Sequence, residues 1–226
     1  MDPSGTIISR LETITDLRGP AGRLEALLNT GTPLAPYAVL VCHPHPLGGG
    51  TMHNKVVYHS MKAFLGLGLP VLRFNFRGTG LSEGQHDHGR GEQDDVRAAL
   101  DWLEERYHLP ILFAGFSFGS YVGTRVCCSD SRVKGAVVLG LPVHAEGRDY
   151  EFKFLSGCGI PKLFVSGTRD QYGPMTQVES VVAHAAPPAE LVWVEGADHF
   201  FVGRLDEVQR AIASWCNAKF IDVAVR

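Results

Sequence analysis

A serine between two glycines is the clearest sign of chemistry in this chain. The segment Gly115-Phe116-Ser117-Phe118-Gly119 follows the apolar run 110–114 and precedes apolar residues at helical spacing. This pattern predicts a strand, a sharp turn and a helix, the context in which a G-x-S-x-G motif presents a nucleophile. Glycine suits both flanking positions because the turn is strained and neighbouring backbone segments approach it closely. Ser117 is therefore the candidate nucleophile.

An aspartate and a histidine follow this serine in an order that fits acyl transfer. Asp170 comes after the apolar run 162–166, and His199 comes after a second run at 190–195. In a Ser-His-Asp triad, the histidine accepts the serine proton, and the carboxylate orients the histidine and stabilises its charged form. We expect Ser117, Asp170 and His199 to be the catalytic residues.

Asp170 and His199 also have purely structural interpretations. Asp170 could close a turn or cap the next helix, and His199 could be a hydrogen-bonding residue of the interior. Asp198 is a competing acid, although a residue next to the histidine in sequence is poorly aimed at its ring. The chain order Ser, Asp, His favours the catalytic interpretation.

Short β-rich runs alternate with helical patterns along the rest of the chain. Strands are expected at 6–10, 23–29, 37–42, 70–75, 111–114, 133–139, 162–166 and 190–195. Helices are expected at 54–67, 92–107, after Ser117, near 176–186 and at 205–220. This alternation predicts an α/β fold with a mainly parallel sheet of about eight strands and helices on both faces. No repeat or long linker interrupts it, so we expect residues 1–226 to form one domain.

Several segments at the predicted strand ends together resemble the α/β-hydrolase superfamily. They are His43-Pro44-His45-Pro46-Leu47-Gly48-Gly49, Phe76-Arg77-Gly78-Thr79-Gly80-Leu81-Ser82, the Ser117 pentapeptide, Gly167-Thr168-Arg169-Asp170 and Gly196-Ala197-Asp198-His199. The resemblance is to small, lidless serine hydrolases related to dienelactone hydrolases and bacterial carboxylesterases, and it runs from about residue 37 to the final helix. Dienelactone hydrolases use a cysteine nucleophile, so the serine here favours a general ester substrate.

Two backbone N–H groups are expected to form an oxyanion hole. One belongs to Phe118, which begins the predicted helix after the nucleophile. The second is expected from the loop after strand 37–42, where Pro44 and Pro46 have no N–H to donate. His45 and Leu47 remain, and the superfamily pattern favours His45.

The segment 140–159 is too short for the helical cap that many α/β-hydrolases insert at this point. We therefore expect no full lid and an open, shallow cleft that suits short acyl groups. Candidates for the walls of the substrate pocket are Phe116, His144, Tyr150, Phe152 and Tyr172.

Composition excludes several other classes of protein. A formal net charge of −3 leaves no basic face for nucleic acid, and no apolar run is long enough to span a bilayer. The N-terminus lacks a signal-peptide pattern, so we expect a cytoplasmic location. The ten histidines include no H-E-x-x-H motif, and we expect no metal and no cofactor.

The five cysteines are odd in number and have no C-x-x-C spacing. This pattern argues against a disulfide framework or a zinc knuckle. We expect all five to be reduced, and most of them to be buried as small hydrophobic residues.

These observations predict a serine carboxylesterase that acts on small ester substrates through an acyl-enzyme. Thioesterase, lactone hydrolase and acylpeptide hydrolase activities use the same machinery and remain alternatives. A non-catalytic binding protein on the same scaffold is the alternative from another class. Chemically competent residues at all three triad positions argue against it. Oligomeric state and the natural substrate do not follow from the sequence.

Overall fold

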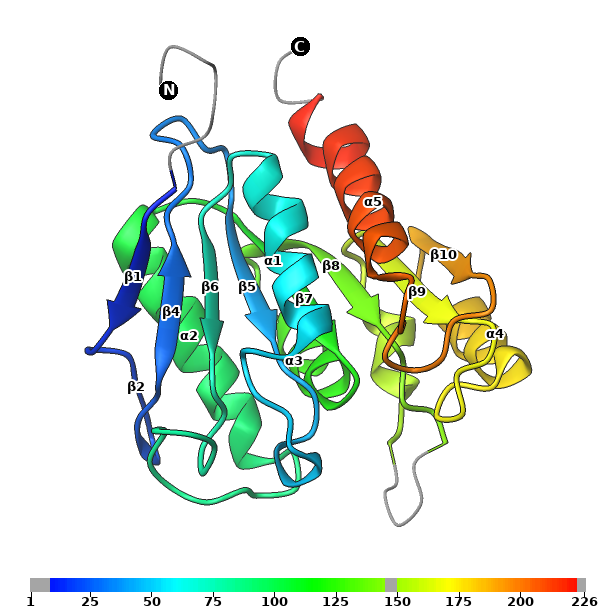
Figure 1. The fold of residues 1–226 in the computed structure, drawn as a ribbon, viewed down its shortest axis with the longest axis horizontal. Helices are drawn as coiled ribbons and strands as arrows, with labels where there is room; N and C mark the ends of the chain where they lie inside the picture. Colours follow the sequence, from blue (N-terminus) through cyan, green and yellow to red (C-terminus); the bar gives the residue numbers. More distant parts are fainter. Residues whose placement is uncertain (1–8, 145–149, 223–226) are drawn as a thin grey trace.

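An eight-stranded sheet forms the centre of the structure, a computed structural model that describes residues 9–144 and 150–222. Its strands are β1 (Leu11–Ile14), β4 (Ala26–Asn29), β5 (Ala38–Cys42), β6 (Val71–Phe74), β7 (Ile111–Phe116), β8 (Val133–Leu139), β9 (Lys162–Gly167) and β10 (Ala189–Val194). Their order is β1-β4-β6-β5-β7-β8-β9-β10 (Figure 1). β1 and β4 are antiparallel to their neighbours, and all pairs from β6 to β10 are parallel. The carboxyl ends of the parallel strands therefore meet at one edge of the sheet.

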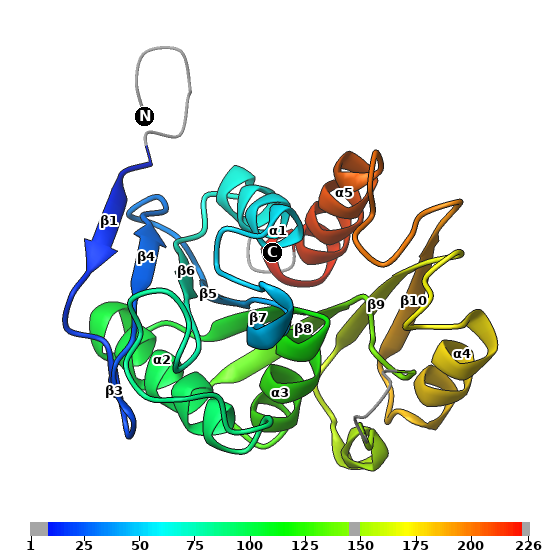
Figure 2. The same cartoon turned by 60° about the horizontal axis from the view of Figure 1, so that its bottom comes forward.

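Helices cover both faces of this sheet. They are α1 (Lys55–Gly66), α2 (Gly91–Tyr107), α3 (Phe118–Cys127), α4 (Met175–His184) and α5 (Leu205–Cys216), with short 3₁₀ segments η1 (Pro46–Gly48) and η2 (Lys153–Gly157) and the π-helical η3 (Asn217–Ile221). Figure 2 shows α1 and α5 on one face and α2 and α3 on the other. Every residue of β5, β6, β7 and β9 is buried, as expected for strands covered on both sides. The predicted α/β fold class is confirmed.

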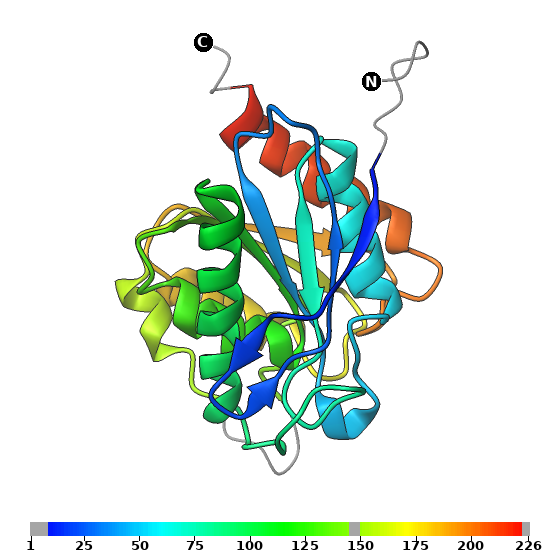
Figure 3. The same ribbon diagram turned by 90° about the vertical axis from the view of Figure 1, so that its left-hand side faces the viewer.

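The amino-terminal edge of the sheet differs from the prediction. Residues 6–8 of the strand expected at 6–10 lie outside the described residues, and the edge strand is β1 instead. The strand expected at 23–29 is divided into β3 (Gly22–Arg23), which pairs with β2 (Arg18–Gly19) in a hairpin, and β4 (Figure 3). The backbone N–H of Leu24 donates to the carbonyl of Leu17 at 2.9 Å, and both residues are buried. This contact closes the hairpin. The alternation of apolar and polar residues along the sequence does not reveal such a contact.

The connection between β8 and β9 carries no large cap. In its described part, residues 140–144 and 150–161, the only helical segment is η2. This agrees with the expected absence of a full lid. Among the described residues, no helix is both long and apolar enough to cross a membrane.

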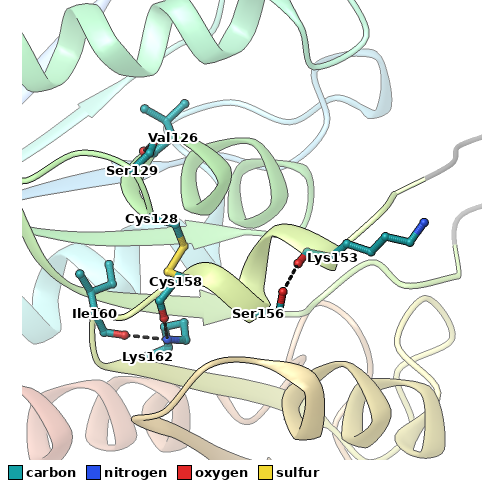
Figure 4. Close-up of a disulfide and its surroundings, with 8 residues drawn as sticks. All are labelled: Val126, Cys128, Ser129, Lys153, Ser156, Cys158, Ile160 and Lys162. Atoms are coloured by element: carbon teal, nitrogen blue, oxygen red, sulfur yellow. Dashed lines mark hydrogen bonds between the residues drawn. A yellow bond between two sulfur atoms is a disulfide. The ribbon is translucent and has the colours of Figure 1, made fainter.

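The expectation that all five cysteines are reduced is wrong for two of them. Cys128, at the end of α3, forms a disulfide with Cys158, which follows η2 (Figure 4). The two residues are 30 positions apart in sequence, yet their Cα atoms lie 4.9 Å apart. The Tyr121 ring of α3 lies 6.2 Å from the Phe154 ring of η2, which places the two segments side by side. Cys42, Cys127 and Cys216 are free and buried, as expected.

Candidate active site

Ser117 occupies a strained turn between β7 and α3. Its backbone angles are φ 53° and ψ −119°, a left-handed conformation that non-glycine residues rarely adopt. A Cβ atom at Gly119 would lie 2.4 Å from the carbonyl oxygen of His43, and one at Gly115 would lie 2.5 Å from that of Gly119. Both glycines of the motif are required because neighbouring backbone fills the space of a side chain.

The side chains of Ser117, His199 and Asp170 form a continuous hydrogen-bonded chain. His199 Nε2 lies 2.9 Å from Ser117 Oγ, and His199 Nδ1 lies 2.9 and 3.0 Å from the two carboxylate oxygens of Asp170. A proton on Nδ1 donates to the carboxylate, which leaves Nε2 to accept the hydroxyl proton. The imidazole of His199 and the carboxylate of Asp170 are almost completely buried. This geometry is what an activated serine requires.

Backbone groups orient Asp170 toward His199. Its Oδ1 accepts hydrogen bonds from the N–H groups of Tyr172 at 2.8 Å and Gly173 at 3.0 Å. Asp198, the competing acid, instead accepts the N–H groups of Phe200 and Val202 within its own loop. The two aspartates therefore have different tasks, and only Asp170 contacts the imidazole among the hydrogen bonds of the described residues.

Three aromatic rings surround the imidazole of His199. The ring centroids of Phe116, Tyr172 and Phe200 lie 5.0, 4.7 and 5.2 Å from that of His199. Phe116 is 1% exposed, so it supports the imidazole from the core and does not line the cleft. Such packing restricts the orientation of the histidine and limits its contact with water.

His43 anchors the loop that follows β5. Its Nε2 accepts the N–H of Phe76 at 3.0 Å, so the proton is on Nδ1, which donates to the carbonyl of Pro44 at 2.6 Å. Burial lowers the pKa of His43 to about 4, which keeps the ring neutral at pH 7. The neutral ring joins this loop to the end of β6.

Hydrogen bonds within the same loop distinguish the two candidate donors. The N–H of Leu47 donates to His45 Nδ1 at 3.2 Å, so it is already engaged. The carbonyl of His45 accepts the N–H groups of Gly48 and Gly50. The rings of His45 and Phe118 lie 4.8 Å apart, which brings their two segments together. This arrangement favours His45 over Leu47.

A cavity of about 340 Å³ opens above Ser117. Its lining residues are Pro44, His45, Gly48, Gly49, Gly50, Asn54, Ser117, Pro142, Tyr172, His199 and Phe200. Among these residues of the described chain there is no carboxylate, lysine or arginine. The cavity therefore favours an uncharged ligand.

A family model described as an alpha/beta hydrolase domain matches residues 37–218. The chain belongs to the alpha/beta hydrolase family. An uncharacterized protein of Rickettsia prowazekii (strain Madrid E) is 37% identical over 202 residues, which cover 86% of this hydrolase and 84% of that protein.

Two solved structures are similar to this hydrolase in both sequence and fold. An alpha-beta serine hydrolase homologue from Coxiella burnetii is 37% identical with a TM-score of 0.81, covering 93% of this chain and 99% of that one. A Xanthomonas campestris protein described as an a/b serine hydrolase without lid is 32% identical with a TM-score of 0.80, covering 93% and 94% of the two chains.

The predicted pocket residues occupy different places in this hydrolase. Tyr172 lines the cavity at Ser117, whereas Tyr150 and Phe152 line a separate cavity of about 550 Å³ next to α4. The Tyr121 ring on α3 packs against them at 4.6 and 5.4 Å and holds them away from the serine. The backbone N–H of His144 donates to the carbonyl of Tyr172 at 2.8 Å, which supports the site indirectly.

Sequence reasoning missed three residues that line the site, Asn54, Pro142 and Phe200. Pro142 follows the carboxyl end of β8 and Phe200 follows His199, so a systematic reading of every strand end would have included both. Asn54 carried a weaker signal as the cap of α1, where its side chain accepts the N–H of Val56.

The Arg77 loop has a structural task in this hydrolase. Its guanidinium pairs with the buried carboxylate of Asp95, with an Nη2–Oδ1 distance of 2.7 Å, and the backbone N–H of Arg77 donates to the same carboxylate. Arg77 follows β6 and Asp95 lies on α2, so the ion pair holds the turn beneath the His43 loop.

In residues 9–144 and 150–222, no cluster of three or more His, Cys, Asp or Glu side chains is placed to hold a metal ion.

Proposed function

We propose that this hydrolase cleaves short-chain carboxylic esters through an acyl-enzyme formed on Ser117. The observation that carries the proposal is the hydrogen-bonded chain from Ser117 Oγ through His199 to Asp170. The likeness to serine hydrolases at 37% and 32% identity supports it.

In this mechanism, Ser117 Oγ attacks the ester carbonyl while His199 Nε2 takes the hydroxyl proton. The same nitrogen then donates that proton to the departing alcohol. Asp170 stays ionised throughout and stabilises the imidazolium. A water molecule, deprotonated by His199, then attacks the acyl-enzyme. As the bond from the acyl carbon to Ser117 Oγ breaks, His199 Nε2 returns the proton to Oγ, which releases the carboxylic acid and restores the serine hydroxyl.

The backbone N–H groups of Phe118 and His45 stabilise the negative charge that develops on the carbonyl oxygen. Phe118 begins α3, so its N–H is one of those that have no acceptor within the helix. Each such donor is worth about 3–4 kcal/mol of transition-state stabilisation. We assign the second donor to His45 because it lines the cavity at Ser117, whereas Leu47 does not.

The cavity supports a small, neutral acyl group. It is about 340 Å³ in volume, and its ionisable lining residues are two histidines and a tyrosine. A carboxylate or phosphate on the substrate would find no cationic lysine or arginine among these residues. The short described connection between β8 and β9 adds little enclosure for a long acyl chain.

Stoichiometric labelling of Ser117 by a fluorophosphonate tests the nucleophile. We expect one label per chain in the wild type and none in Ser117→Ala. Folded wild-type protein that takes up no label would overturn the proposal and favour a non-catalytic binding protein.

A substrate panel tests the reaction class. It comprises p-nitrophenyl esters of increasing acyl length, acyl thioesters, lactones and aminoacyl amides, compared by kcat/KM. We expect the highest kcat/KM for the acetyl and butyryl esters. A higher value for thioesters, lactones or amides would reassign the activity to that class.

A further inference from the structure

His86 and Glu92 form a buried pair outside the proposed triad. His86 Nδ1 lies 2.8 Å from Glu92 Oε1, with side-chain exposures of 7% and 0%. The Glu92 carboxylate also accepts the N–H groups of Asp87 and Gly89, each at 2.8 Å. The loop that carries His86 is thereby tied to the first turn of α2.

The His86 ring contacts both segments of the proposed oxyanion hole. Its centroid lies 4.8 Å from that of His45 and 5.6 Å from that of Phe118. The His45 and Phe118 rings lie 4.8 Å from each other, so the three rings pack together. They come from the loop after β5, the start of α3 and the loop before α2, which are distant in sequence.

Both ring nitrogens of His86 are buried, and neither makes a hydrogen bond within the described residues, so Nδ1 approaches Glu92 closely without hydrogen-bond geometry. Leaving a polar atom in this state costs free energy, and such costs in native proteins call for an explanation. The ring therefore acts here through its contacts with the His45 and Phe118 rings and with Glu92, and not through a hydrogen bond from either nitrogen.

We propose that His86, held by Glu92, is a positioning residue for the oxyanion hole, an inference that rests on the proposed function. The His45 donor sits in a loop that continues into Gly48, Gly49 and Gly50, which bring little side-chain packing of their own. Donors must be held within about 0.5 Å of the productive geometry to stabilise the transition state. The His86 ring supplies that restraint by pressing the His45 side chain against Phe118.

A His86→Ala variant tests this role. We expect kcat on a short p-nitrophenyl ester to fall about 10-fold, with KM within about 2-fold of wild type, because a misplaced donor weakens transition-state binding alone. Ser117 labelling by the fluorophosphonate should slow by a similar factor. A purely structural role would lower the melting temperature and leave kcat unchanged.

His59→Ala is the matched control. His59 lies on α1, is also largely buried, and contacts Gln209 at 3.2 Å on the other side of the sheet. We expect its kcat and labelling rate to equal those of wild type.

A double-mutant cycle with His45→Ala tests the route of the effect. Because His86 acts through the His45 ring, its removal should lower kcat by no more than about 2-fold in the His45→Ala background. Independent, multiplying effects would overturn the inference.

Two milder variants keep the test decisive if His86→Ala does not fold. We expect His86→Phe, which restores a ring, and Glu92→Gln, which weakens the anchor, each to lower kcat about 3-fold with KM unchanged. Wild-type kcat in both variants would overturn the inference. Wild-type protein that is not labelled at Ser117 overturns the proposed function, whereas a labelled wild type with equal labelling of His86→Ala overturns this inference alone.

Discussion

The carboxylate oxygens of Asp170 lie 2.9 and 3.0 Å from His199 Nδ1, and the backbone N–H groups of Tyr172 and Gly173 hold the carboxylate in place through Oδ1. An amide at this position keeps the volume of the side chain but loses the charge that, in the proposed mechanism, selects the His199 tautomer and stabilises the imidazolium. We expect Asp170→Asn to lower kcat about 10³- to 10⁴-fold, with KM changed less than about 5-fold. Steady-state kinetics on a p-nitrophenyl ester measures both. Retention of a tenth of wild-type kcat would show that Asp170 is not the acid.

Asp198→Asn is the companion variant. Asp198 Oδ1 accepts two backbone N–H groups, and an asparagine oxygen accepts them as well. We expect kcat within about 3-fold of wild type. A loss as large as that of Asp170→Asn would transfer the acid role to Asp198.

The strained backbone of Ser117 predicts that a glycine at this position raises the stability of the protein while activity is lost. Ser117→Gly removes the proposed nucleophile and also the Cβ that opposes φ 53°. We expect it to be about 1 kcal/mol more stable than Ser117→Ala, while both variants lose the fluorophosphonate label. Urea unfolding compares them, and equal stabilities would show that the turn stores no strain from the side chain.

Burial of His43 predicts a pH dependence of stability. The pKa is about 4 in the folded protein and 6.5 as the ordinary value, so the unfolded chain binds the proton first as pH falls. Stability is therefore complete above about pH 6.5 and declines between pH 6.5 and 4. We expect the titration of His43 to lower the free energy of unfolding by about 2 kcal/mol between pH 8 and pH 5.

The His43→Gln variant isolates this contribution. Its side-chain oxygen accepts the N–H of Phe76 but does not titrate. Urea unfolding at pH 8 and pH 5 should show a smaller decline in the variant than in wild type. Equal declines would mean that His43 does not titrate as its burial implies.

The Cys128–Cys158 disulfide predicts a response to reduction. A crosslink over a separation of 30 residues removes conformational freedom from the unfolded chain, worth about 3–4 kcal/mol. We expect dithiothreitol to lower the melting temperature of wild type but not of Cys128→Ala/Cys158→Ala. Thiol titration of the unfolded, unreduced chain should detect only Cys42, Cys127 and Cys216, and five reactive thiols would contradict the crosslink.

Local sequence patterns were sufficient for the buried parts of the fold. The apolar run at 133–139 matches β8 residue for residue, and α1 begins where Asn54 supplies a cap. A short, mainly apolar run rich in β-branched residues is typical of a strand that is covered on both faces. The edge strands near 6–29 were misplaced because half-exposed residues alternate weakly, and their pairing depends on a hairpin closed by Leu17 and Leu24.

The sequence by itself determined the Ser117 turn, since glycine sterics act over a few residues, and it determined the chain order of Asp170 and His199. Only the tertiary structure decided which polar groups meet. Its strand order brings the ends of β7, β9 and β10 together and places His199 2.9 Å from Ser117. Packing likewise turned Tyr150 away from the cleft and brought two cysteines into contact. Distances between remote segments depend on how whole elements pack, and no local pattern encodes them.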